Sequence, residues 1–190
     1  MIEQHYRHLG EILWKKSLVA RSIMAHVLRR MGEPEVSYED RIVEAIYMDI
    51  VEKVDAIQIL MRAGNKSGVE VIARSVIEGV CGLTFILRDG ADLKNKRALA
   101  YEYFYHLNQY KSAKEALKRI KGGKPGDVGL FPQNDRVRKA MEYHYRVITG
   151  KKFDVVRQEY EKSKKRKKDK TFYPRYWFDL FGGPSNIHDL

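Results

Sequence analysis

Apolar side chains recur along this chain at steps of three, four and seven residues, the spacing that places them on one face of an α-helix. The pattern predicts a long amphipathic helix over residues 3–31 and a second one that begins after Ser37. Asp40, three residues after Ser37, completes a pattern that resembles a capping box, and Gly64-Asn65 is typical of a helix end. Each helix is expected to pack one face against a shared core.

The third segment, Ser67–Arg88, is the most apolar helical run of the chain. Its charges before the last residue are Glu70, Arg74 and Glu78, spaced four apart and therefore expected on one helix face. The uncharged stretch that follows Glu78 is nine residues long, whereas a bilayer-spanning helix needs roughly 20 apolar residues. We therefore predict a core helix in which Arg74 is buried between Glu70 and Glu78.

Three more helices are predicted, over residues 93–120, from about residue 135 to 149, and over 154–165, with a glycine-rich loop at 121–134. The chain shows neither strand alternation nor an internal repeat. These features predict an all-α protein, a bundle of about six helices with four long central ones.

The predicted domains are a helical bundle over residues 1–170 and an irregular aromatic tail over 171–190, which ends in the start of a helix at Ile187. Because one helical turn has almost no stability by itself, the natural chain is expected to continue past Leu190.

The net charge of +11 favours an anionic partner such as RNA. Much of the excess comes from the run at 164–170, and aromatic residues follow it, so this segment could combine phosphate contacts with base stacking. The alternative is a solvated basic run followed by aromatic residues that dock onto the bundle. The predicted nucleic-acid contacts are Lys164, Lys165, Arg166, Lys167 and Lys168.

The single cysteine, Cys81, excludes a disulfide framework and a cysteine metal site, and the charged N-terminus does not resemble a signal peptide. We expect a cytoplasmic protein that does not enter a membrane. The pairs His5/His8 and Glu102/His106 each offer two metal ligands, and no metal site is predicted. No cofactor-binding motif is present, so no cofactor is expected.

The first candidate site is a polar pocket formed by Arg74, Glu78, Arg97 and Tyr101. In that pocket Arg74 would hold an anion, Glu78 would orient Arg74 or act as a base, and Tyr101 would donate a hydrogen bond. The same residues also suit a structural ion network that connects two helices.

The second candidate uses arginine–histidine pairs. Helical ribonucleases of the HEPN type carry an arginine that holds phosphate and, four to six residues further, a histidine that helps to activate a ribose hydroxyl. Arg21–His26 and Arg138–His144 have this spacing. About 1.5 such matches are expected by chance, so the motif alone discriminates little. On a helix the two side chains of each pair would also point roughly 120° to 140° apart.

Several segments together resemble a bacterial all-α family of unknown function. They are Ala73–Glu78, Arg97-Ala98 followed by Tyr101, and Trp177 followed by Gly182-Gly183 and Asn186–Leu190. The resemblance spans roughly residues 5–190 and implies a HEPN-like helical arrangement, without a settled activity. It also implies further helices beyond this segment that carry a serine and a histidine.

Three functions remain open at this point. The first is a helical protein that binds a phosphate-bearing ligand or RNA through the pocket around Arg74. The second is a dimerisation module, a homodimer whose basic tail contacts nucleic acid without specificity. The third is a HEPN-like ribonuclease that uses Glu78, His144 or His26. The sequence does not decide whether the protein is an enzyme.

Overall fold

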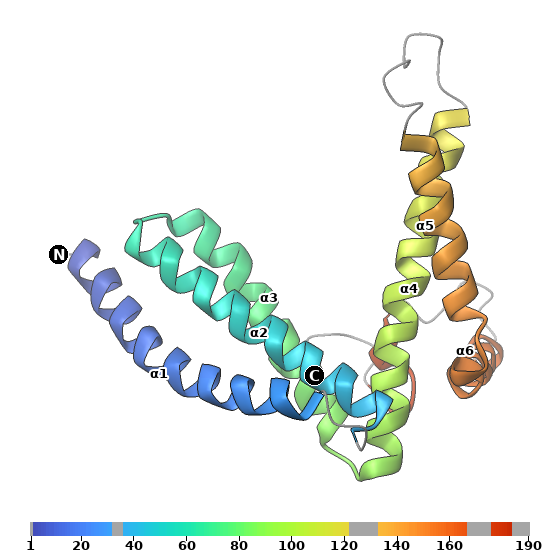
Figure 1. Ribbon diagram of the computed structural model, residues 1–190, viewed down its shortest axis with the longest axis horizontal. Helices are drawn as coiled ribbons and strands as arrows, with labels where there is room; N and C mark the ends of the chain where they lie inside the picture. The colour runs from blue at the N-terminus through green and yellow to red at the C-terminus, as the bar shows by residue number, and fades with distance from the viewer. Residues whose placement is uncertain (1, 32–35, 122–132, 167–175, 184–190) are drawn as a thin grey trace. The chain divides into compact units, whose positions relative to one another are not determined.

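The computed structural model describes residues 2–31, 36–121, 133–166 and 176–183, and all regular structure within these ranges is helical. The all-α prediction is confirmed, and the predicted helices match the observed ones to within a few residues. Residues 122–132 of the loop predicted at 121–134, and the predicted helix start at Ile187, lie outside the described residues. The elements are α1 (Ile2–Met31), α2 (Tyr38–Arg62), α3 (Lys66–Leu87), α4 (Ala91–Lys121), α5 (Gln133–Ile148), η2 (Lys151–Phe153), α6 (Asp154–Arg166) and η3 (Trp177–Asp179) (Figure 1).

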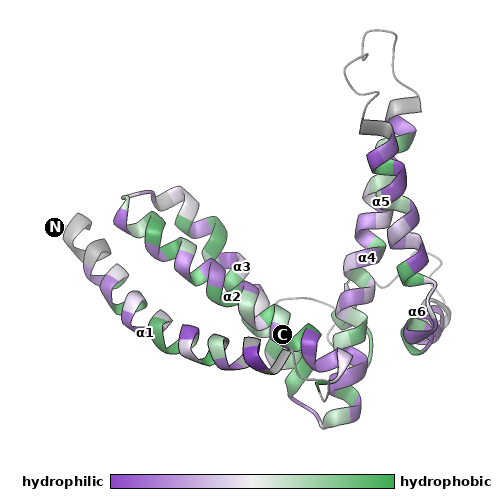
Figure 2. Ribbon diagram, in the orientation of Figure 1, coloured by the Kyte–Doolittle hydropathy of each residue, from purple (hydrophilic) through white to green (hydrophobic). Residues whose placement is uncertain are grey.

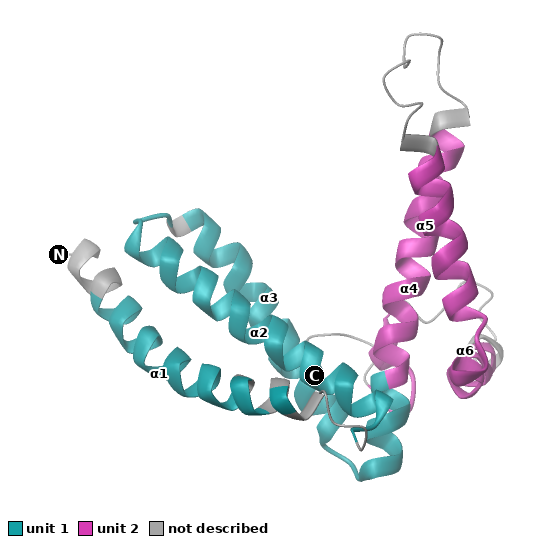
Figure 3. Ribbon diagram, viewed as in Figure 1, with its two compact units in different colours: residues 1–98, 184–190 teal, residues 99–183 magenta. Residues whose placement is uncertain are grey.

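The chain forms two compact units (Figure 3). Unit 1 comprises residues 1–98 and 184–190, and unit 2 comprises residues 99–183. Helix α4 contributes its first eight residues to unit 1 and the remainder to unit 2. The described part of the aromatic tail, residues 176–183, belongs to unit 2. The division into a bundle domain over 1–170 and a tail over 171–190 stays a prediction.

Two side-chain caps define the ends of the helices in unit 1. The Ser37 hydroxyl accepts a hydrogen bond from the Asp40 backbone N–H at 3.0 Å and donates one to the Asp40 carboxylate at 2.8 Å, as the capping pattern predicts. The Asn65 side chain accepts a bond from the Gly68 N–H at 3.0 Å. Asn65, which the sequence pattern assigns to the end of α2, therefore also begins α3.

Helix α2 is the central element of unit 1, because it packs against both α1 and α3. Its buried face includes Ile46, Ile50 and Ile57. On α3, a Cβ atom at Gly79 would lie 3.0 Å from the Ile50 side chain, and one at Gly68 would lie 3.1 Å from a neighbouring leucine. Glycine at these positions therefore lets α2 and α3 approach closely.

Aromatic side chains of α4 form the core of unit 2. Tyr103 packs against Phe153 and Tyr160 with ring centroids 5.7 and 6.3 Å apart, and Phe104 meets Tyr160 edge-on at 5.8 Å. All four rings are buried. The aromatic character of the predicted fourth helix is thus explained by packing.

The described tail residues dock onto this unit. Trp177 contacts the ring of Tyr101 edge-on at 5.4 Å, and Phe178 and Leu180 are buried. For these residues the docking alternative is confirmed. Tyr176 remains exposed beside them, stacked on Phe178.

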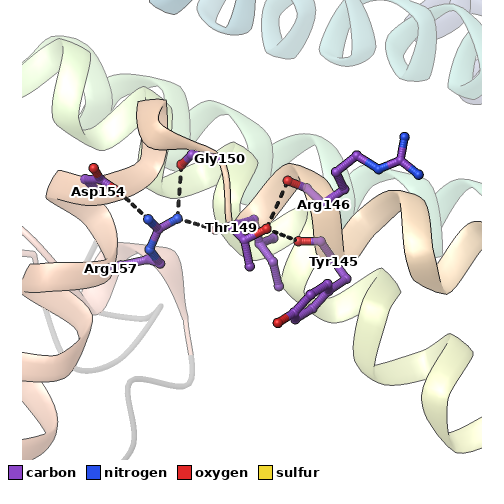
Figure 4. Close-up of polar contacts among 7 residues, drawn as sticks. Tyr145, Arg146, Thr149, Gly150, Asp154 and Arg157 are labelled. Carbon is purple, nitrogen blue, oxygen red and sulfur yellow. Dashed lines mark hydrogen bonds and ion pairs between the residues drawn. The ribbon is translucent and has the colours of Figure 1, made fainter.

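The turn between α5 and α6 is held by Arg157 (Figure 4). Its guanidinium donates hydrogen bonds to the carbonyls of Ile148 at 2.7 Å and Gly150 at 3.0 Å, and pairs with Asp154. The Thr149 hydroxyl donates a further bond to the Tyr145 carbonyl at 2.9 Å. A cation at these carbonyls stabilises the C-terminal end of α5 and fixes η2 beside it.

A buried arginine connects α3 to α4 in unit 1. The side chain of Arg97 is 3% exposed. It donates to the Phe85 carbonyl at 2.8 Å, pairs with the Asp89 carboxylate at 2.7 Å and lies 4.0 Å above the Phe85 ring. The hydrogen bond from Arg97 also holds the pKa of Asp89 below its usual value. A charge buried this deeply is tolerated because its partners are in place.

Replacing Arg97 by alanine should therefore destabilise unit 1 by about 2 kcal/mol, because the buried Phe85 carbonyl loses its donor and Asp89 loses its ion-pair partner. Arg88→Ala is the matched control, since Arg88 also contacts Asp89 and Phe85 but from an exposed position. Urea unfolding followed by circular dichroism measures both variants. Equal losses of stability would contradict a special role for the buried guanidinium.

Candidate functional site

The structure places Arg74 on the surface. Its side chain is 76% exposed, and its Nε atom lies 2.9 Å from a Glu78 carboxylate oxygen one turn along the same helix. The prediction of a buried Arg74 is wrong, because α3 packs against α2 through the face that carries Gly68 and Gly79. Arg74 points roughly 120° away from that face. An exposed pair at this spacing contributes little to stability.

The other predicted pocket residues have different surroundings. Arg97 is already paired with Asp89, and Tyr101 lies in unit 2 against Trp177. Ligand binding by these residues stays a prediction, although Arg74, the proposed anion-binding residue, is exposed. A surface depression of about 470 Å³ instead lies on α4. It is lined by Lys111, Ser112, Glu115, Ala116 and Arg119, none of which belongs to the predicted pocket.

In the two arginine–histidine pairs the arginines have aspartate partners. Arg21 lies 2.8 Å from Asp55 of α2, and His26 is exposed on α1. Arg138 lies 2.8 Å from Asp135, one turn earlier on α5. Each arginine is therefore neutralised within its own unit, and the helical spacing directs it away from its histidine.

His144 does have a partner, although it comes from another helix. Its Nδ1 atom lies 2.8 Å from Nδ1 of His106, whose side chain is 9% exposed on α4. At this distance one ring nitrogen donates its proton and the other accepts it. The sequence alone gives no signal for this contact, because the two histidines are 38 residues apart and lie on different helices.

Further polar groups complete a cluster that we call the histidine cluster: Glu102, His106, His144 and Lys152. Glu102 Oε1 lies 3.6 Å from His106 Nε2 and 3.9 Å from Lys152 Nζ. Burial lowers the pKa of His106 below its usual value, and Glu102 opposes this effect only in part. His106 is therefore neutral at pH 7.

Aromatic rings flank these histidines. The ring of Tyr143 on α5 lies 5.9 Å from that of His106, and the ring of Tyr105 on α4 lies 5.2 Å from it. Both tyrosines are exposed. Two solvent-exposed tyrosine rings therefore adjoin the histidine cluster.

The charge of the protein is divided unequally between its units. Residues 99–183 contain 21 of the 36 lysines and arginines but only 10 of the 25 aspartates and glutamates. Unit 1 contains 15 of each sign, so the whole excess of +11 belongs to unit 2. The basic run at 164–170 supplies five of these charges, and the other six lie elsewhere in the unit. Figure 2 shows the contrast between the largely apolar α3 and the more polar α5 and α6.

One face of α5 combines exposed basic side chains with Tyr143. Arg136, Lys139 and Arg146 are all exposed, and together with Tyr143 they fall within an arc of about 80° around the helix axis. We call these four residues the α5 basic face. Because the Tyr143 ring also contacts His144 at 5.1 Å, this face is continuous with the histidine cluster.

The side chains of the predicted nucleic-acid contacts cannot be placed on this surface. Lys164, Lys165 and Arg166 lie at the end of α6, where the structure describes the backbone alone, and Lys167 and Lys168 lie outside the described residues. Among the residues whose side chains are described, no three histidine, cysteine, aspartate or glutamate side chains gather to hold a metal ion. None of the described helices is long and apolar enough to span a bilayer.

Comparison with known proteins gives a family. Residues 40–190 match the family of unknown function DUF5677, and the chain belongs to this family. Neither the curated proteins nor the solved structures contain a match to the chain. The membership therefore agrees with the predicted resemblance to an all-α family of unknown function.

The lowered pKa of His106 predicts how the stability of unit 2 depends on pH. Above its ordinary value of 6.5, the histidine is neutral in both the folded and the unfolded chain. Below that pH the unfolded chain binds the proton more readily, so the stability should fall as the pH is lowered from about 7 to 5. His106→Asn should reduce this dependence, as measured by urea unfolding at several pH values.

His8→Ala, at an exposed position on α1, is the control and should leave the pH dependence unchanged. A His106→Asn variant with the slope of the wild type would show that this histidine titrates alike in the folded and unfolded chain.

Proposed function

We propose that this member of the DUF5677 family binds RNA, or a related polymer of phosphate groups, on the basic surface of unit 2. The observation that supports this proposal is the charge division, with a net charge of +11 in unit 2 and zero in unit 1. A basic surface attracts a polyanion and gains binding free energy by releasing the counterions of its phosphates.

The α5 basic face is the part of this surface that we assign to the ligand. Its three cationic side chains would contact phosphates, and the exposed ring of Tyr143 would stack on a base. Stacking on an aromatic ring requires an unpaired base, so a single-stranded chain fits this face better than a duplex. We propose that the basic residues 164–168 add further phosphate contacts.

Other features favour RNA within the class of polyanions. The sequence resembles proteins with a HEPN-like helical arrangement, among which ribonucleases occur. A chain with one cysteine also suits the reducing cytoplasm, where RNA is abundant. We therefore place the protein in the cytoplasm.

The arginine–histidine ribonuclease is less well supported than binding. Arg21 and Arg138 each have an aspartate partner, and His26 is exposed on the neutral unit 1. The pocket around Arg74 is also less well supported, because its arginine is exposed and paired with Glu78. Neither alternative explains why the net positive charge of the protein lies in unit 2.

Replacing Arg136, Lys139 and Arg146 together by glutamine should weaken the binding of a single-stranded RNA. If each side chain contacts one phosphate, the slope of log Kd against log salt concentration should decrease by about 2. Fluorescence anisotropy with a labelled oligonucleotide over a range of salt concentrations measures both quantities.

The matched control replaces Lys15, Lys16 and Arg29 by glutamine, three exposed residues of α1 in unit 1. It removes the same total charge and should leave the affinity nearly unchanged. If both triple variants weaken binding equally, only the total charge matters and the assignment to α5 is wrong. If the wild-type protein does not bind RNA, the proposed function itself is wrong.

A second candidate function is self-association through α3, the dimerisation module of the sequence analysis. Ile77, Val80, Thr84 and Leu87 are exposed and follow one another at steps of three, four and three residues. This spacing forms an apolar strip along one face of the helix. The strip lies away from the glycine face that contacts α2, so a second copy of the chain would bury it.

Ile77→Glu should therefore convert a homodimer into a monomer, because a charge at the centre of an apolar interface loses its solvation. Val71→Glu is the control, since Val71 is also exposed on α3 but lies outside the strip. Light scattering coupled to size-exclusion chromatography measures the molar mass at several concentrations. A wild-type protein that stays monomeric, or a Val71→Glu variant that dissociates equally, would contradict self-association through this strip.

A further inference from the structure

The two histidines of unit 2 form a single titrating pair. The chain contains six histidines, and His106 and His144 are the two that lie in residues 99–183. Their Nδ1 atoms are 2.8 Å apart, with His106 on α4 and His144 on α5. Both rings also contact the ring of Tyr143, which belongs to the α5 basic face. All the histidines of the basic unit therefore adjoin the face that we assign to RNA.

The short contact limits the number of protons that the pair can bind. Two neutral imidazoles form this contact with one proton between the Nδ1 atoms, whichever ring donates it. One added proton is compatible with the contact, because an imidazolium Nδ1–H donates to the neutral ring in a charge-assisted bond. A second added proton would direct two Nδ1–H groups at each other across 2.8 Å. The folded pair therefore has room for one extra proton.

The groups around the pair act on this extra proton in opposite directions. Burial disfavours it and lowers the pKa of His106. The carboxylate of Glu102, 3.6 Å from His106 Nε2, favours it, whereas the charge of Lys152 on η2 disfavours it. The other titratable groups in contact with the pair are Tyr105 of α4 and Tyr143 of α5. An additional negative charge nearby would therefore favour the protonated pair.

A polyanion on the α5 basic face would supply such a charge. Tyr143 directly precedes His144, and Arg146 and Lys139 of the same face lie about 3 and 8 Å from His144 along the helix axis. At physiological ionic strength charges interact over about 8 Å, and partly buried groups are screened less than exposed ones. Phosphates held by this face would thus raise the proton affinity of the pair.

We propose that the binding of single-stranded RNA at the α5 basic face is coupled to the uptake of one proton by the pair His106 and His144. This coupling rests on the proposed function, because bound RNA supplies the phosphates. Linkage between two ligands is reciprocal, so RNA that raises the proton affinity of the pair binds more tightly when the pair is protonated. The affinity for RNA therefore rises as the pH falls from 8 to 6.

Fluorescence anisotropy at pH 8, 7 and 6 and at constant salt concentration measures this coupling. The probe is a single-stranded RNA oligonucleotide without terminal phosphates, with a label whose emission does not change with pH. The Kd of the wild-type protein should fall about fivefold between pH 8 and pH 6, a usual size for the coupling between two sites. The slope of log Kd against pH should not exceed 1, because one proton is bound.

A double variant tests the role of the pair. His106→Asn combined with His144→Asn removes both titrating rings, and its Kd should hardly change between pH 8 and pH 6. The matched control combines His8→Asn with His26→Asn, at two exposed positions of α1 in unit 1, and should keep the dependence of the wild type. If both double variants lose the dependence equally, the overall charge causes it and the role of the pair is overturned.

Two measurements use the wild-type protein alone and do not depend on the folding of a variant. Calorimetric titration with the same RNA, in two buffers of different ionisation enthalpy, counts the protons taken up at pH 6.5. The expected number lies above zero and does not exceed one. NMR titration of the histidine ring protons should show that RNA raises the apparent pKa of the pair. An uptake of two protons would overturn the single shared proton.

The results separate this coupling from the proposed function. RNA that binds without proton uptake, and with the same affinity at pH 8 and pH 6, would overturn the coupling and leave RNA binding intact. An absence of RNA binding at every pH would reject both.

Discussion

The burial of a charged or titratable side chain is the constraint on which much of this structure depends. Arg97 and His106 are both buried on α4, and each is accommodated in a different way. Arg97 keeps its charge and needs the Phe85 carbonyl, the Phe85 ring and Asp89 around it. His106 can lose its charge, so burial lowers its pKa and the neutral ring forms a bond to His144. One helix thus carries a structural cation in unit 1 and a proton acceptor in unit 2.

The sequence predicted the helices well because the signals for them are local. Ser37 and Asp40 form the expected cap, and the apolar spacing of α2 corresponds to its buried face. Arg74 shows where this reasoning stops. Its spacing from Glu70 and Glu78 correctly placed the three charges on one face, but spacing does not say which face is buried. The glycines at 68 and 79 carried that information, since close helix contacts need small residues.

The histidine cluster could not have been predicted in the same way. His106 and His144 come from different helices, and their contact depends on how α4 and α5 pack. The unequal charge of the two units could not be predicted either. The net charge is a property of composition, whereas its location depends on the boundary between the units after residue 98. The run at 164–170 predicts nucleic-acid contacts near the tail, although more than half of the excess positive charge lies elsewhere in unit 2.

The exposed ring of Tyr143 connects the α5 basic face to the histidine cluster. If the histidine pair had only a structural role, two apolar side chains would fill the same space without a desolvation penalty. Two imidazoles in edge-on contact with exposed tyrosines carry a desolvation cost, and the pH dependence of stability is part of that cost. A partly exposed imidazole next to a cationic, aromatic face offers a reason to retain them. The same desolvation that weakens the fold at low pH keeps His106 neutral, and a neutral His106 can share a hydrogen bond with His144 across the 2.8 Å contact between their Nδ1 atoms.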